Sequence, residues 1–121
     1  MLVIGDGVET TLIRAALAKQ PEVRVVDVPH ARQALKLLKT QSAPMALAIA
    51  GAAELRTPAY ELLKTLEARG IPLVGIAAGL SQEVKQHALA AGVKEIHDRP
   101  RDWQAYSELI EAVIRRFTQA D

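Results

Sequence analysis

Short apolar runs alternate with longer amphipathic segments along the whole chain, and this alternation strongly limits the folds open to it. The short runs, rich in apolar or β-branched residues as buried strands are, cover residues 2–5, 23–28, 45–50, 72–77 and 94–97. The longer segments, with apolar residues at helical spacing, cover residues 8–19, 31–40, 58–69, 82–91 and 103–118. Strands that alternate with helices favour parallel pairing in one covered sheet. We therefore predict an α/β fold, with a doubly wound, five-stranded parallel sheet and five helices.

Several predicted helix ends carry residues suited to them. Ser81 and Asp102 stand just before two predicted helices, where a side-chain oxygen can accept a hydrogen bond from a first-turn N–H. Gly70 and Gly92 follow two predicted helices, at the left-handed position that glycine adopts without strain. These four residues set the predicted boundaries in the second half of the chain.

The size and charge of the chain predict one soluble domain spanning residues 1–121. Its 121 residues are enough for a buried core, and 50% of them are hydrophobic. A formal net charge of +1 provides no general attraction to nucleic acid or to a membrane surface. Cysteine is absent, which excludes disulfides and thiol catalysis and fits a cytoplasmic protein. No apolar run approaches the roughly 20 residues that span a bilayer, and no signal peptide is recognisable.

Function in a parallel sheet is expected at the carboxyl ends of the strands, where ligands gather. In this chain those ends are Gly5-Asp6-Gly7, Asp27-Val28-Pro29, Ala50-Gly51, Ala77-Ala78-Gly79 and Asp98-Arg99-Pro100. These five short segments are therefore the places to search for chemistry.

Two stretches of the second half, ELLKTLEARGIPLVGIAA (61–78) and ALAAGVKEIHDRP (88–100), follow the apolar strand that ends at Ala50. In this succession the chain resembles the receiver domain of bacterial two-component response regulators, a phosphorylation-driven switch. The resemblance covers nearly the whole chain and implies a flavodoxin-like fold with strand order 2-1-3-4-5. It also implies a pair of acids after the first strand, an acceptor aspartate after the third, a hydroxyl after the fourth and Lys-Pro after the fifth.

This chain departs from that pattern at most of the matching positions. The resemblance assigns a degenerate phosphorylation pocket to Asp6, Ala50, Gly51, Ala77, Arg99 and Pro100. One acid remains at Asp6, and either Ala50 or Gly51 takes the place of the acceptor, with no oxygen to phosphorylate. A lone carboxylate should bind Mg²⁺ weakly, so we expect no metal and no cofactor. No pair of titratable groups forms a nucleophile with its base, so we expect no catalytic residue. An aspartate restored at position 50 should not by itself restore a working switch, because Ala77 supplies no hydroxyl and Ile96 stands where the family carries its switch aromatic.

Arg99 replaces the lysine of the family, and the two side chains are not equivalent. The planar guanidinium favours a fixed carboxylate partner. We expect Arg99 to pair with Asp6 or Asp98 and close the pocket; the other interpretation leaves it in solvent.

The resemblance implies a pseudo-receiver: a non-phosphorylatable regulatory module that binds proteins in bacterial signal transduction, rather than an enzyme. Its partner would be another protein or an output domain fused in a longer chain. Receiver domains commonly dimerise through the fifth strand and its flanking helices. This points to a homodimer or docking surface over residues 82–91, 94–97 and the last helix, with Ile96, Trp103 and Tyr106. The two aromatic residues share a helix face, and packing on the sheet edge is their other interpretation.

A second function stays open at the turn between the first strand and the first helix. Gly5 and Gly7, followed about 20 residues later by Asp27, distantly resemble a dinucleotide-binding fingerprint. Thr10 occupies the position of the third glycine, which weakens the match. The alternative to the signalling module is therefore a small-ligand or nucleotide-binding sensor half-domain that uses the Gly5–Thr10 turn.

Overall fold

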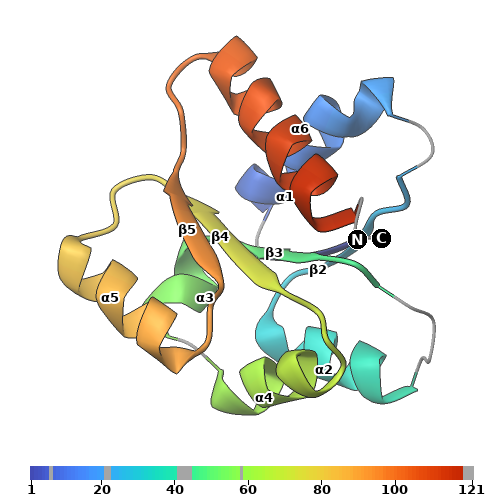
Figure 1. Cartoon of the computed structure of the whole chain (residues 1–121), viewed down its shortest axis with the longest axis vertical. Helices are drawn as coiled ribbons and strands as arrows, with labels where there is room; N and C mark the ends of the chain where they lie inside the picture. Colours follow the sequence, from blue (N-terminus) through green and yellow to red (C-terminus); the bar gives the residue numbers. More distant parts are fainter. Residues whose placement is uncertain (6, 21–22, 41–44, 58, 119–121) are drawn as a thin grey trace.

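One parallel five-stranded sheet forms the centre of the molecule (Figure 1). The computed structural model describes residues 1–5, 7–20, 23–40, 45–57 and 59–118. The strands are β1 (Leu2–Ile4), β2 (Val26–Val28), β3 (Ala48–Ala50), β4 (Leu73–Ala77) and β5 (Glu95–Asp98), in the order β2-β1-β3-β4-β5. The predicted fold class and strand order are confirmed.

Helices cover both faces of this sheet. They are α1 (Gly7–Ala16) with the 3₁₀ turn η1 (Leu17–Lys19), α2 (Ala31–Thr40), α3 (Ala52–Arg56), α4 (Tyr60–Ala68), α5 (Gln82–Ala91) and α6 (Trp103–Thr118). In Figure 1, α1 and α6 lie on one side of the sheet and the other four α-helices on the opposite side. Two separate buried apolar clusters match these two layers.

Alternation along the strands explains the two clusters. Successive side chains of a strand point to opposite faces. Val3 and Ile49 accordingly pack with the residues of α1 and α6, whereas Ile4 and Ala50 pack with those of α2 and α4. Every residue of β1, β3 and β4 is buried, as expected of strands covered on both faces.

The predicted caps are present in the structure. Ser81 Oγ accepts a hydrogen bond from the Val84 N–H at 3.1 Å, and Asp102 Oδ1 accepts one from the Ala105 N–H at 2.8 Å. These bonds satisfy donors that a helix start would otherwise leave unpaired. The starts of α5 and α6 were therefore predictable from residues close to them in the sequence.

A short helix after β3 was not predicted. Residues 58–69 were expected to form a single helix, but α4 begins at Tyr60 and the five-residue α3 precedes it. Five residues are too few to display a helical period. Tertiary packing holds α3 instead: Leu55 is 1% exposed and lies over Gly75 of β4. A Cβ at Gly75 would stand only 2.6 Å from Leu55 Cδ2, so this glycine provides the room for α3.

Candidate functional site

A hollow of about 210 Å³ lies where β1 and β3 end, beside the start of α1. Its wall consists of Gly5, Val8, Glu9, Gly51, Ala52, Glu54 and Arg99. The Glu54 carboxylate lies close to Gly5, the residue that follows β1, since a Cβ at Gly5 would stand 3.7 Å from Glu54 Oε2. Among the described residues, this hollow has two carboxylates and one guanidinium in its wall.

Glu9 is at the centre of the polar contacts of the site. Its side chain is almost fully buried, and the residue is only 3% exposed. Arg99 donates two hydrogen bonds to Glu9 Oε1, one from Nε at 2.8 Å and one from Nη2. Tyr106 donates its hydroxyl hydrogen to the other oxygen, Oε2, at 2.5 Å. We call these three residues the Glu9 cluster; it joins α1, the β5–α6 loop and α6.

Burial explains why the cluster contains these groups. A buried carboxylate is costly unless a counter-charge and hydrogen bonds compensate it, and here both oxygens have partners. Burial also raises the pKa of the Tyr106 hydroxyl well above its ordinary value of 10, and the hydrogen bond to Glu9 raises it further. Tyr106 is therefore a neutral donor at any physiological pH.

The partner of Arg99 differs from the expected ones. Asp6 lies outside the described residues, and the alternative partner, Asp98, pairs instead with Lys85 Nζ at 2.8 Å. Adjacent residues of an extended strand point to opposite faces, so Asp98 turns toward α5 while Arg99 turns toward α1 and α6. Pairing with Asp98 and free solvation of Arg99 were both wrong.

The small residues assigned to the pocket are divided between two environments. Gly51 lines the hollow, next to Glu9. Ala50 and Ala77 are 1% and 0% exposed, belong to the apolar cluster under α2 and α4, and do not line it. Of the two residues considered for the acceptor position, Gly51 is the one that reaches the site. Pro100 lines a separate groove.

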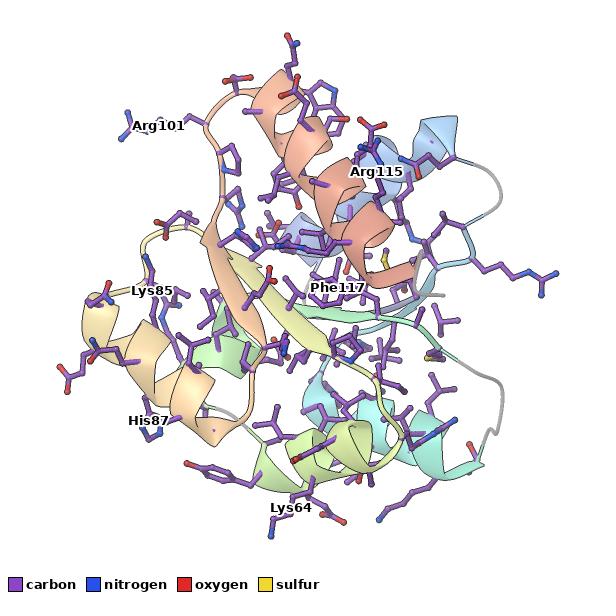
Figure 2. All side chains as sticks on the ribbon, in the orientation of Figure 1. Lys64, Lys85, His87, Arg101, Arg115 and Phe117 are labelled. Carbon is purple, nitrogen blue, oxygen red and sulfur yellow. The ribbon has the colours of Figure 1, made fainter. Side chains whose placement is uncertain are left out.

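That groove, of about 190 Å³, lies at the start of α6. Its lining residues are Leu12, Arg99, Pro100, Arg101, Asp102, Trp103 and Tyr106. Arg101 extends away from the body of the protein at this end (Figure 2). Arg99 lines both the hollow and the groove, and so forms a shared wall between them.

The residues expected on an interaction surface differ in exposure. Trp103 is 48% exposed, Ile96 is partly buried, and Tyr106 is 2% exposed. Trp103 stacks on Tyr106, with ring centroids 5.9 Å apart and planes inclined by 15°. Tyr106 as a surface anchor was therefore wrong: it lies one helical turn further in, above the sheet, and belongs to the core with Ile110 and Val113.

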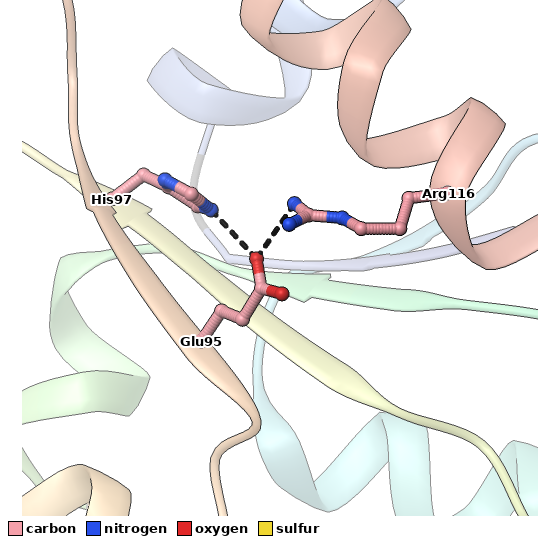
Figure 3. A network of polar contacts seen from close by, with 3 residues as sticks. All are labelled: Glu95, His97 and Arg116. Atoms are coloured by element: carbon pink, nitrogen blue, oxygen red, sulfur yellow. Dashed lines mark hydrogen bonds and ion pairs between the residues drawn. The ribbon is translucent and has the colours of Figure 1, made fainter.

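A second polar network holds the other end of α6 to the edge strand. Figure 3 shows Glu95 of β5 between His97 of the same strand and Arg116 of α6. Glu95 Oε1 accepts a hydrogen bond from Arg116 Nη2 at 2.8 Å and lies 2.9 Å from His97 Nε2. This network is more open to solvent than the Glu9 cluster, because the Arg116 side chain is 51% exposed.

Sequence reasoning missed Glu9. An acid in the first turn of a helix is favourable there for local reasons, so its presence signals no further role. Its partners are 90 and 97 positions away, and only the fold brings them together. The position of Glu9 just after a glycine-flanked strand end was the one available hint.

Two further expectations bear on the described part of the chain. Within the described residues, no group of three or more His, Cys, Asp or Glu side chains is arranged to hold a metal ion. None of the helices described is both long and apolar enough to span a bilayer.

Comparison with known proteins identifies the fold. No protein-family model and no curated protein matches the chain. The phosphorylated cyanobacterial phytochrome response regulator RcpA aligns with a TM-score of 0.76 and 14% identity, over 98% of this chain and 93% of that one. The receiver domain of the putative response regulator NarL of Mycobacterium tuberculosis aligns with a TM-score of 0.68 and 18% identity, over 98% and 96%.

A pilus assembly protein also shares the arrangement. CpaE of Caulobacter crescentus aligns with a TM-score of 0.59 and 19% identity, over 93% of this chain and 90% of that one. Identities this low carry information about the backbone and not about chemistry. The element order, the strand order and these alignments together show that the chain has the fold of response-regulator receiver domains.

Proposed function

We propose that this protein is a regulatory module with the receiver fold, which acts by binding another protein and does not accept a phosphoryl group. The observation that carries the proposal is the end of β3. Gly51 stands there at the hollow and has no side chain to phosphorylate. Arg99, which takes the place of the family's lysine, is already bound to Glu9. Both departures affect groups on which phosphorylation of a receiver domain depends.

Phosphorylation is tested directly by incubating the protein with acetyl phosphate and Mg²⁺ and measuring its intact mass. We expect no change of mass. A conventional receiver domain treated in the same way is the positive control. A stable phosphoryl adduct mapped to any carboxylate of this chain, Glu54 included, would contradict the proposal.

The proposed binding surface extends over α5, β5 and the start of α6. Its support is the exposure of Trp103, because half-exposed tryptophans often anchor protein interfaces. The proposed occupant is a second copy of the chain or an output domain. Sedimentation of the parent and of Trp103→Ala should show weaker association in the variant, by roughly thirtyfold in affinity if Trp103 is a central anchor.

A matched control separates loss of an anchor from a general surface effect. Val26 on β2 is 37% exposed and lies on the opposite edge of the sheet. Val26→Ala should leave association unchanged, and circular dichroism should show both variants folded. If Trp103→Ala associates like the parent, the binding surface lies elsewhere.

A small-ligand sensor is the second candidate, since a hollow that could admit a small molecule lies beside the Gly5–Thr10 turn. With two carboxylates and one guanidinium, the wall of the hollow carries more negative than positive groups, which opposes a phosphorylated ligand by charge repulsion. A thermal-shift panel of nucleotides and dinucleotides decides, since a ligand that binds only the folded state raises stability by mass action. We expect no shift at millimolar nucleotide.

A further inference from the structure

We infer that the buried Glu9 side chain holds Arg99 and Tyr106 in one arrangement, and that this arrangement sets the position of Trp103 on the surface. The inference rests on the proposed function and deepens it. It gives the module a fixed state that needs neither a transferred group nor a ligand.

The first step is that Arg99 is held by two hydrogen bonds to Glu9. Its Nε and Nη2 both donate to the same oxygen of Glu9, and charge-assisted bonds of this kind are strong. The backbone of Arg99 is also fixed, since its N–H donates to the Ala77 carbonyl at 3.0 Å. The guanidinium therefore has one well-determined place, between the hollow and the groove.

The second step is the link from Glu9 to the surface. Tyr106 is held through its hydroxyl by Glu9 Oε2 and through its ring by the core. Trp103 stacks on that ring while nearly half of the residue remains exposed. The buried carboxylate thus determines, through one hydrogen bond and one ring contact, how Trp103 is presented.

The third step concerns the charges that face the cluster. Glu54 faces it across the hollow, and Arg101 and Asp102 lie along the groove. Asp102 accepts the bond that caps α6, and Asp98 is engaged with Lys85 on the other face of the sheet. Among the described residues, Arg99 is thus the cation bonded to Glu9, so neutralising Glu9 removes the counter-charge that strengthens the hydrogen bonds from Arg99.

The test is Glu9→Gln, which keeps the size of the side chain and removes its charge. Trp103 is the one tryptophan of the chain, so its fluorescence reports on this surface alone. We expect the variant to stay folded by circular dichroism, with a red shift of the Trp103 emission and faster quenching by acrylamide. The amide signals of residues 99–106 should shift along with those next to residue 9.

Glu95→Gln is the matched control. It removes a carboxylate that also bonds to α6, through Arg116, but 13 residues beyond Trp103, or about 20 Å along the helix. This variant should leave the Trp103 emission unchanged. If a folded Glu9→Gln protein shifts only the amide signals next to residue 9 and keeps the parent emission, the inference is wrong.

Tyr106→Phe provides a second test that does not depend on the folding of Glu9→Gln. It removes the hydroxyl bond and keeps the ring on which Trp103 stacks. We expect shifts of the amide signals at positions 9 and 99 and a smaller red shift of the emission; unchanged signals at both positions would overturn the inference. A phosphoryl adduct on the parent protein would refute the proposed function without altering either result.

Discussion

Glu9 occupies the first turn of α1, where a carboxylate is ordinarily solvated and gains a little from the helix dipole. In this protein it is buried, and its charge is balanced by Arg99, whose side chain is 29% exposed. Removing one member of such a pair costs more than the pair contributes, since it leaves an uncompensated charge in the interior. We therefore expect substitutions in the Glu9–Arg99 pair to have the largest effect on stability among the residues of the site.

Arg99→Ala should lower the free energy of unfolding by about 2–4 kcal/mol, because Tyr106 alone then compensates the Glu9 carboxylate. Urea denaturation measures the change. The double variant Glu9→Gln with Arg99→Met should recover part of the loss, as both charges are then absent. A single-variant cost near zero would mean that Glu9 regains water when Arg99 is removed.

Alkaline pH should reveal the raised pKa of Tyr106. Above about pH 10 the unfolded chain releases the phenolic proton while the folded protein retains it, so the folded state binds more protons. Stability is therefore retained below that pH and falls by about 1.4 kcal/mol per pH unit above it.

Urea midpoints of the parent and of Tyr106→Phe, compared from about pH 8 to pH 11, separate this contribution from other alkaline titrations. The parent should lose stability more steeply than the variant. Equal slopes would show that Tyr106 is not held as a neutral, buried donor.

At the scale of elements, two features position the site: the bonds that attach α6 to the rest of the molecule, and the packing of α3 against β4. The helix α6 is held near its start by the Glu9–Tyr106 bond and near its end by the Glu95–Arg116 pair, with apolar packing between them. The helix α3 carries Glu54 to the hollow and is held by Leu55 against β4. Leu55 can pack this closely on β4 because Gly75 has no side chain.

Gly75→Ala should destabilise the protein by about 1–3 kcal/mol through overpacking, since Leu55 is buried and has little room to move. Chemical denaturation measures the loss. In a Leu55→Ala background the same substitution should cost clearly less, because the atoms that it meets are gone. An equal cost in both backgrounds would show that β4 itself, rather than the packing of Leu55 against it, requires glycine at position 75.

At the scale of the whole molecule, the fold brings the ends of distant segments to one edge of the sheet, where the hollow and the Glu9 cluster lie. A group that binds can shift an equilibrium only if its contacts differ between two states. Ala77 has no hydroxyl, and its side chain lies in the core. Arg99 is bound to Glu9. Gly51 lines the hollow and Ala50 does not, so a carboxylate introduced at position 51 is the one that would reach it.

Gly51→Asp should therefore fold but fail to switch. A Cβ at Gly51 would lie 3.6 Å from Glu9 Cβ and Cγ, an ordinary contact, and the new carboxylate would face two others. After acetyl phosphate and Mg²⁺ treatment, we expect no shift of amide signals across α5 and β5. Such a shift would show that the domain retains a latent switch.

Ala50→Asp is the contrasting variant. Ala50 is 1% exposed in the apolar cluster, so an aspartate there would bury an unpaired carboxylate. We expect a loss of several kcal/mol, on the order of 3 or more, or failure to fold. Thermal denaturation beside Gly51→Asp distinguishes the two positions.

The sequence by itself determined the layered α/β architecture, the alternation of five strands with five longer helices along the chain, and the caps at Ser81 and Asp102. These features depend on periodicity and on bonds between residues three or four positions apart, which a linear chain displays directly. The strand order came from the resemblance to receiver domains, and the alignments with solved structures agree with it.

Only the tertiary structure decided that Glu9, and not Asp98, binds Arg99, that Tyr106 is buried while Trp103 is exposed, and that Gly51 rather than Ala50 reaches the hollow. The first outcome joins residues 90 positions apart. The choice between Ala50 and Gly51 depends on which face of the sheet each residue points to, and a shift of one residue reverses that face. The burial of Tyr106 depends on how α6 packs over the sheet and α1. Local sequence patterns do not specify such long-range contacts, because they form only when the sheet and its two helical layers are packed together.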